Sequence, residues 1–286
     1  MPQDQEQRHV YYDHDLKIEA YNLSGIVQKF PNHFHDYYVI GFIEGGRRHL
    51  WCKGKEYDTS PGDLILFNPR DNHYCAPIDG ENLDYRCVNI PVDVMAEAVK
   101  EITGLDYTPR FTCNVVYQSD ITDSLNTLYL SILNHAPRFE KEEALFFLLE
   151  QVLSEYSVPE RERDTPASMP QIQALCDYME EHFAESITLD DLLAMTDFGK
   201  SYLLRCFTRQ IGVSPYRYLQ TVRLSKAKKF LEQGIPPVEA ADMAGFSDQS
   251  HFTNFFKEFI GLTPKQYQRI FTDTRKPENP AKERLK

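Results

Sequence analysis

The chain has 286 residues, enough for two domains of ordinary size, and its 42% hydrophobic and 26% charged residues are typical of a globular protein. The polar start Met1–Arg8 lacks the apolar core of a signal peptide, and no apolar run approaches the roughly 18 residues needed to cross a bilayer, so we expect a cytoplasmic protein without a membrane partner. Its six cysteines are widely spaced and form no C-x-x-C pair, which favours reduced thiols over a disulfide framework.

The net charge of −12 is divided unevenly along the chain. Residues 200–286 carry 16 Lys+Arg and 8 Asp+Glu, whereas residues 1–199 carry 15 and 35. Attraction to phosphate depends on local charge, because charges more than about 10 Å away are screened. The basic C-terminal third is therefore compatible with nucleic-acid binding, although many basic surfaces have no such role.

Residues 10–91 contain short β-type runs separated by turn signals. The runs span residues 39–43, 48–52, 64–67 and 84–90, with Gly- or Pro-containing turns at 44–46, 53–55, 60–63 and 68–72. Closely spaced antiparallel strands of this kind predict a small barrel or sandwich.

Residues 92–156 change to helical periodicity. Their apolar stripes are Val94, Ala98 and Ile102; Leu125, Leu128, Tyr129, Ile132 and Leu133; and Leu145, Leu148, Leu149, Val152 and Leu153. Such stripes can close onto the barrel or onto a second subunit. The division we expect is a sensor and dimerisation domain at 1–156, a charged proline-bearing linker at 157–170, a helical domain at 171–271 and a charged tail at 272–286.

The helical domain contains an internal repeat. The matched segments are Leu192-Leu193 with Ala240-Ala241, Asp197-Phe198 with Gly245-Phe246, Leu203 with Phe252, Phe207 with Phe256, Gly212 with Gly261, Ser214-Pro215 with Thr263-Pro264, and Tyr218 with Tyr267. The order of elements, the glycine stop and the proline start agree together, and random helical sequence rarely supplies all three. This repeat is the strongest signal in the chain.

Each copy of the repeat has the parts of a helix-turn-helix unit. In the first, Thr188 and Asp191 can cap a short helix, and a second helix runs from Lys200 to Ile211 and stops at Gly212. In the second, we expect a short helix over 239–244 and a longer one, capped by Ser247, that ends at Ile260. Between the copies, Ser214-Pro215 starts a spacer helix to about Glu232, roughly 25 Å long at ~1.5 Å per residue.

The outward faces of the two longer helices suit DNA recognition. Arg pairs bidentately with guanine, Gln and Asn pair with adenine, and Ser pairs with either. The spacer can place the helices in successive major grooves, ~34 Å apart. The candidate DNA-binding residues are Ser201, Leu204, Arg205, Arg209, Gln249, Ser250, Asn254 and Lys257, of which Arg209 and Lys257 suit phosphate contacts. A single such pattern is often only an α-hairpin, but two copies with polar outer faces favour double-stranded DNA as the partner.

Residues 172–271 resemble the DNA-binding domain of the AraC/XylS family of transcription regulators, most clearly in GVSPYRYLQTVRLSKAKKFL and AGFSDQSHFTNFFKEFIGLTPKQY. The resemblance implies that Ser201, Leu204 and Arg205 of the first recognition helix contact bases. It implies the same for Gln249, Ser250 and Asn254 of the second. Two residues depart from the family pattern: Leu193 replaces a usual alanine, and Leu204 can contact a thymine methyl group but cannot form a hydrogen bond.

The segment HFHDYYVIGFIEGGRRHLWCKGKEYDTSPGDLILFNPRDNHYC resembles the cupin-like sensor domain of many family members. His33 and His35, two apart on a predicted strand, would face the same side, and His73 follows a later turn. Three converging histidines can bind zinc, iron or manganese, or can contact a small-molecule effector. We predict effector contacts at His33, His35 and His73, with no metal and no cofactor.

Two functions remain open at this point. The first is an effector-controlled transcription regulator that forms a homodimer through residues 120–156. RNA polymerase is a further candidate partner of such a regulator. The second is a metal-dependent cupin enzyme, an oxygenase or isomerase, with an accessory helical domain. Catalytic cupins usually have a glutamate separated from the second histidine by three or four residues, where this chain has Val39-Ile40. The sequence therefore favours the regulator, and we predict no enzymatic activity.

Overall fold

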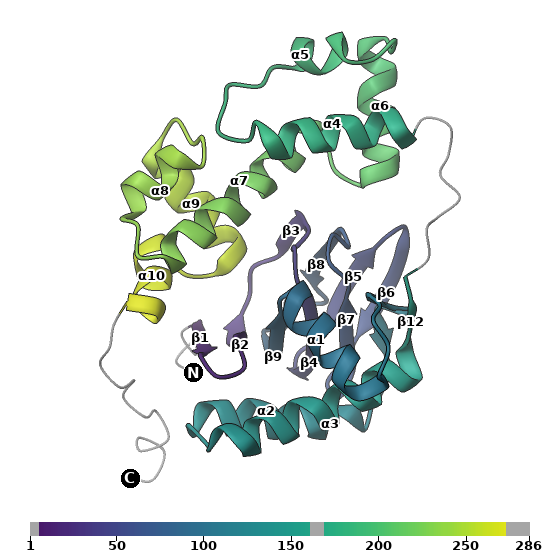
Figure 1. The fold of residues 1–286 in the computed structure, drawn as a ribbon, viewed down its shortest axis with the longest axis vertical. Helices are drawn as coiled ribbons and strands as arrows, with labels where there is room; N and C mark the ends of the chain where they lie inside the picture. Colours follow the sequence, from purple (N-terminus) through teal and green to yellow (C-terminus); the bar gives the residue numbers. More distant parts are fainter. Residues whose placement is uncertain (1–5, 161–168, 273–286) are drawn as a thin grey trace.

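The computed structural model describes residues 6–160 and 169–272 and combines a β-rich N-terminal part with an all-helical C-terminal part (Figure 1). The expected fold class, a cupin-like sensor followed by tandem helix-turn-helix units, is confirmed. Among the described residues, no helix is both long enough and apolar enough to cross a membrane. All six cysteines are free thiols.

The N-terminal strands form two main sheets, which together we call the β-domain (residues 7–90, joined by β11). The six-stranded sheet has the order β1-β2-β9-β4-β7-β11, and the four-stranded sheet has the order β3-β8-β5-β6. The strands are β1 Gln7–Asp13, β2 Ile18–Ile26, β3 Phe30–His33, β4 Tyr38–Gly45, β5 Arg48–Cys52, β6 Lys55–Thr59, β7 Leu64–Phe67, β8 His73–Pro77, β9 Leu83–Ile90 and β11 Val115–Val116.

The apolar run of β4 is explained by burial on both faces of its sheet. Ile40 and Phe42 pack into one core with three helices, whereas Val39 and Ile43 pack into a second core toward the four-stranded sheet. The three helices are α1 Val92–Thr103, α2 Ile121–Leu133 and α3 Arg138–Tyr156. Their buried residues include the predicted stripe on α3 and that on α2 except Leu133, which is partly buried. These helices cover the outer face of the sheet (Figure 1).

Two features of the N-terminal part differ from the expectations. From sequence, the segment from Met1 to about Asp15 has no apolar anchor beyond Val10-Tyr11-Tyr12 and is a plausible moving part, but β1 pairs with β2 along its full length. Asp13, at the end of β1, forms a buried ion pair of 2.6 Å with Lys141 of α3. Residues 157–159, within the expected linker, form β12 Ser157–Pro159, which pairs with β10 Pro109–Phe111.

The C-terminal part consists of two three-helix groups joined by one long helix (Figure 1). The helices are α4 Met169–Glu181, α5 Leu189–Ala194, α6 Lys200–Ile211, α7 Pro215–Glu232, α8 Pro237–Met243, α9 Gln249–Ile260 and α10 Pro264–Thr272. Leu203 and Phe207 of α6 lie in the core of the first group, and Phe252 and Phe256 of α9 lie at the matching positions of the second.

The helix ends confirm most of the predicted capping. Thr188 and Asp191 form a capping box on α5, and the Ser214 hydroxyl accepts from the Arg217 amide at the start of α7. The prediction that Ser247 caps α9 is wrong: Asp248 is the N-cap and accepts from the amide of His251, because the turn extends one residue further. The short helix α8 begins at residue 237 rather than 239, since proline is favoured in the first helical turn.

Candidate functional site

Three histidine rings meet in the β-domain between the two sheets. His33 ends β3 and lies directly opposite His73, the first residue of β8. His35 lies beyond the end of β3 rather than on a strand, yet its ring centroid is 4.7 Å from that of His33 and 5.3 Å from that of His73. The predicted set is therefore brought together. One ring nitrogen from each histidine lies within 4.8 Å of the other two.

Two of the rings are oriented by backbone carbonyls. The Nδ1 atoms of His33 and His73 lie 2.6 Å and 2.8 Å from the carbonyl oxygens of Pro31 and Asp71. A carbonyl can only accept, so both Nδ1 atoms carry the proton and donate it. In the neutral ring, the Nε2 lone pair then remains available to a ligand.

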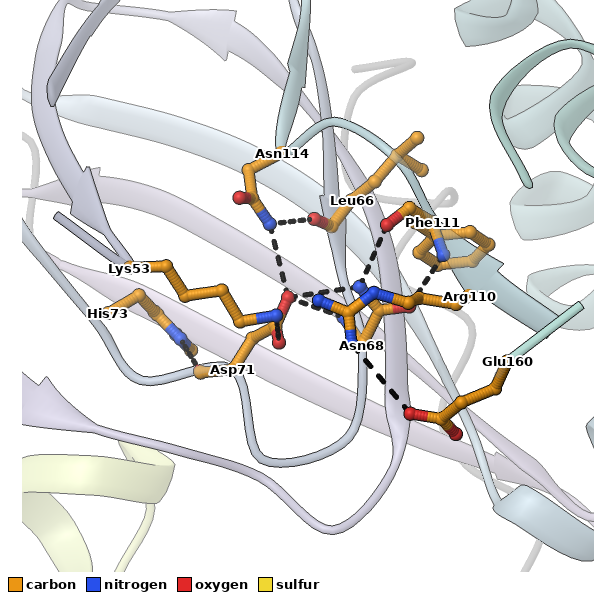
Figure 2. A network of polar contacts seen from close by, with 9 residues as sticks. All are labelled: Lys53, Leu66, Asn68, Asp71, His73, Arg110, Phe111, Asn114 and Glu160. Carbon is orange, nitrogen blue, oxygen red and sulfur yellow. Dashed lines mark hydrogen bonds and ion pairs between the residues drawn. The ribbon is translucent and has the colours of Figure 1, made fainter. Parts of the chain in front are cut away.

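A polar network holds the loop that carries His73 (Figure 2). The buried Asp71 carboxylate accepts hydrogen bonds from Asn68 and Asn114 and pairs with the Lys53 ammonium group. Asn68 in turn binds the backbone of Phe111 through both ends of its amide. These contacts fix the Asp71 carbonyl, and through it the plane of the His73 ring.

The environment keeps all three rings neutral. Burial lowers the pKa of His73 to about 4, and it lowers the pKa of His33 well below the ordinary value, with His73 as the next cause. Burial followed by the two neighbouring rings does the same for His35. At neutral pH the cluster therefore offers unprotonated imidazoles.

The histidines line a cavity of about 130 Å³. Most of its wall is aromatic or aliphatic, including Phe30, Phe67 and Leu50, and Arg8 and Asn89 add polar groups. No Asp or Glu side chain is among the described residues that line it. Val39 lines the wall where the catalytic glutamate of a cupin would stand, so the enzyme alternative finds no support here.

The helical part closes this cavity. Phe259 and Ile260, the last two residues of α9, form part of its wall. The Phe259 ring packs edge-on against the His33 ring, with the ring centroids 5.2 Å apart. The guanidinium carbon of Arg217 lies over the Phe259 ring, 4.6 Å from its centroid. From sequence we expect α9 to bury Phe259 or Ile260 in the core of the second unit, and the structure buries both there. Sequence analysis missed their second contact, with the β-domain, because helical periodicity does not report which distant surface an apolar face meets.

A buried polar cluster fastens the second unit to the β-domain. Glu19 of β2 accepts from Lys228 of α7 at 2.7 Å, from Asn89 at 3.3 Å and from the Tyr267 hydroxyl of α10. Burial alone would raise the pKa of Glu19, but the Lys228 ammonium and these hydrogen bonds outweigh it and hold the pKa below its ordinary value. No sequence signal connects these residues, which lie more than 200 positions apart in the case of Glu19 and Lys228.

A second set of contacts fastens the first unit. The Arg70 guanidinium donates to both carboxylate oxygens of Glu180 in α4, at 2.7 Å and 2.8 Å. The side-chain amides of Asn32 and Asn72 both donate to the carbonyl of Gly212, the residue that ends α6, at 3.1 Å. Each helix-turn-helix unit is therefore attached to the β-domain separately.

The candidate DNA-binding residues lie on α6 and α9. Seven of the eight are exposed, and Leu204 is half-buried; the exposed ones are Ser201, Arg205, Arg209, Gln249, Ser250, Asn254 and Lys257. Within the described ranges, none of the four basic or amide side chains Arg205, Arg209, Asn254 and Lys257 takes part in an ion pair or hydrogen bond of the protein itself. Leu193 is partly buried against the core of the first unit.

Two family models match separate parts of the chain. Residues 16–149 match the AraC-like ligand binding domain, and residues 192–270 match a helix-turn-helix domain. The chain is 50% identical over 246 residues to the HTH-type transcriptional regulator YbfI of Bacillus subtilis, covering 86% of this chain and 90% of YbfI. It is 26% identical to the transcriptional activator RhaS of Klebsiella pneumoniae, with 82% and 86% covered.

Solved structures with a similar fold include ToxT from Vibrio cholerae. An apo form of ToxT superposes with a TM-score of 0.57 at 15% identity, covering 91% of this chain and 99% of ToxT. A ToxT structure with a bound unsaturated fatty acid gives 0.52 at 17% identity, covering 91% and 96%. At these identities the likeness concerns the fold alone.

Proposed function

Because this chain belongs to the AraC family of helix-turn-helix transcription regulators, we propose that the cavity beside α9 binds its small-molecule effector and that α6 and α9 read its DNA site. The family assignment makes the protein a DNA-binding transcription regulator with an effector-binding domain. The proposal adds which residues perform each task. His33, His35 and His73 contact the effector, and the exposed residues of α6 and α9 contact bases and phosphates.

The observation that carries the proposal is the double role of α9. Phe259 and Ile260 at its C-terminal end line the cavity, whereas Asn254 is exposed on the same helix. An effector can shift a conformational equilibrium only through a difference in its interactions with the two states. A molecule in the cavity meets this condition, because it touches the end of a recognition helix directly.

The size of the cavity limits what the effector can do. A space of about 130 Å³ is close to that of an engineered cavity of about 150 Å³ that holds benzene. A molecule of that size fits beside Phe259 with little movement. A larger effector must displace Phe259 and Ile260, and with them the end of α9, so the size of the occupant sets the size of the response.

Two kinds of DNA contact are expected from the exposed residues. Ser201, Arg205, Gln249 and Asn254 lie in the first half of their helices, where side chains suit base edges. The 18-residue helix α7 between them is ~27 Å long, which suits recognition helices about one DNA turn apart. A pair of half-sites separated by one turn is therefore the expected operator.

Genome-wide mapping of bound DNA is the first test, followed by fluorescence anisotropy on a mapped site. Arg205→Ala and Asn254→Ala should each weaken binding by about 1–3 kcal/mol and relax the preference at particular base pairs. Arg47→Ala is the control, because Arg47 is an exposed basic residue of the β-domain that pairs with Asp79 and Glu81. An unchanged footprint of the Arg205→Ala, Asn254→Ala double variant would contradict the assignment of the recognition helices.

We also propose that the chain forms a homodimer through α2 and α3. Large apolar side chains are exposed on these helices: Phe139 is 78% exposed, Phe147 56% and Leu130 38%. Apolar surface of this kind favours a protein interface, and a second copy presents the same surface by symmetry. Full-length protein should then bind a two-site operator more tightly than a fragment that starts near residue 169, because the two DNA-binding parts are tethered.

A further inference from the structure

The histidine cluster has the properties of a metal site as well as of an effector contact. Its three ring nitrogens converge within 4.8 Å, and two of the rings donate Nδ1–H to backbone carbonyls. This pattern is usual for metal-binding histidines, in which the second nitrogen is held by a carbonyl or carboxylate and the ring is thereby oriented. The Asp71 network holds one of those carbonyls rigidly (Figure 2).

The separation of the nitrogens is close to what one ion requires. Three nitrogens at 2.0–2.1 Å from a tetrahedral ion lie about 3.4 Å apart. Closing from 4.8 Å needs a movement of about 1 Å, which side-chain rotation can supply. His35 can supply it, because it lies beyond the end of β3 and, unlike His33 and His73, is not fully buried.

The donor set selects a class of metal. Three neutral imidazoles favour Zn²⁺, Co²⁺ or Ni²⁺ and do not suit Mg²⁺ or Ca²⁺, which bind oxygen. Cys75 and Cys87 also line the cavity, but neither belongs to the group of converging ligand atoms, which the three histidines alone make up among the described residues. Three protein ligands leave at least one coordination position open toward the cavity.

We infer that His33, His35 and His73 bind one divalent transition-metal ion and that an anionic oxygen of the effector completes its coordination. The anionic oxygen is inferred from the charge of the site. Three neutral ligands leave the ion with its full double positive charge, and the described lining of the cavity contains no carboxylate to balance it. Arg8, the charged residue of that lining, also favours an anion. This inference replaces the metal-free site expected from sequence, and it depends on the proposed effector site only for the last ligand.

Full-length protein without a histidine tag, stripped with a chelator, is titrated with Zn²⁺ and with Co²⁺ in a calorimeter. One ion per chain is expected. Co²⁺ should show visible absorption bands of a four- or five-coordinate site, and Zn²⁺ should raise the thermal unfolding temperature. His35→Ala should weaken metal binding at least about 100-fold, since even loss of a supporting contact costs 10–100-fold.

The matched control is His49→Ala. His49 is a partly exposed histidine of the same domain that pairs with Asp58 at 2.8 Å and does not line the cavity. The His49→Ala variant should bind Zn²⁺ as tightly as the wild type does. Because His35 is less buried than His33 and His73, its replacement is expected to leave a folded protein, which a urea unfolding curve verifies. His73→Ala gives a second, buried position.

Two results would overturn the inference: less than one tightly bound ion per wild-type chain, or equal weakening by His35→Ala and His49→Ala. DNA binding by the same chelated wild-type protein separates this failure from failure of the proposed function. Loss of the metal site alone leaves operator binding intact. If the protein binds no operator with or without Zn²⁺, the assignment of α6 and α9 fails instead.

Discussion

Replacing Glu19 with Gln tests whether the buried polar cluster holds the second helix-turn-helix unit against the β-domain. The change removes the negative charge opposite Lys228, whose side chain is 10% exposed, while it keeps the size of the side chain. Removing one partner of a buried ion pair typically costs 3–5 kcal/mol, because the other charge stays buried without compensation. We expect about 3 kcal/mol here, the low end, because Glu232 remains near Lys228 and also raises its pKa.

The measurement is urea unfolding of the wild type, Glu19→Gln, Lys228→Met and the double variant. The double variant should recover most of the loss, because it removes both charges of the buried pair and leaves neither uncompensated. Glu56→Gln, an exposed acid on β6, is the control and should stay within about 0.5 kcal/mol of the wild type. A loss for Glu19→Gln no larger than for Glu56→Gln, or strictly additive single losses, would refute the reasoning.

The same pair predicts a dependence on pH. The folded pKa of Glu19 lies below its ordinary value of 4.5, so its carboxylate contributes stability that is complete above about pH 4.5. That contribution is lost as the pH falls through the folded pKa. The difference in stability between wild type and Glu19→Gln should therefore be constant from pH 6 to 8 and shrink below pH 4.5.

Three further predictions concern other parts of the chain. Lys257→Ala should weaken binding to all DNA sequences alike and lower the salt slope by about one in anisotropy titrations, whereas Arg205→Ala should change sequence preference. Phe147→Ser should lower the dimer fraction in sedimentation without loss of thermal stability, because this exposed ring covers no core of its own chain. Gly41→Ala should cost about 1–3 kcal/mol in urea unfolding, because its new Cβ would clash with the Tyr85 ring in the cavity wall.

The parts that could be predicted from sequence are those decided by neighbouring residues. The capping box of Thr188 and Asp191, the Ser214-Pro215 helix start and the glycine that ends α6 need only local chemistry, and the structure has all three. The strand over 84–90 was predicted from its composition and lies within β9. The repeat strengthened the prediction of two helix-turn-helix units, because the same local signals occur twice in the same order.

The parts that could not be predicted depend on contacts between distant segments. Strand alternation shows that Val39 and Ile40 face opposite sides, but only the register with β7 and β9 shows that Val39 faces the cavity. The helical spacing of Phe259 predicts that it is buried in a core, but that spacing does not predict its contact with the ring of His33. The approach of His35 to the other two histidines was expected from a strand, yet a short loop achieves it.

Under the proposed function, the two sets of contacts with the β-domain would let an effector in a small cavity control a domain that binds two DNA grooves. Gly212 at the end of α6 is held by Asn32 and Asn72, whereas α9 abuts the cavity beside the Glu19 cluster. An effector that displaces Phe259 acts on the second unit and leaves the contacts of the first in place. The relative position of α6 and α9 then changes while each unit keeps its own fold. Since binding free energies are linked, operator DNA that selects one such position must change effector affinity by the same factor, about 5–150-fold for a coupling of 1–3 kcal/mol.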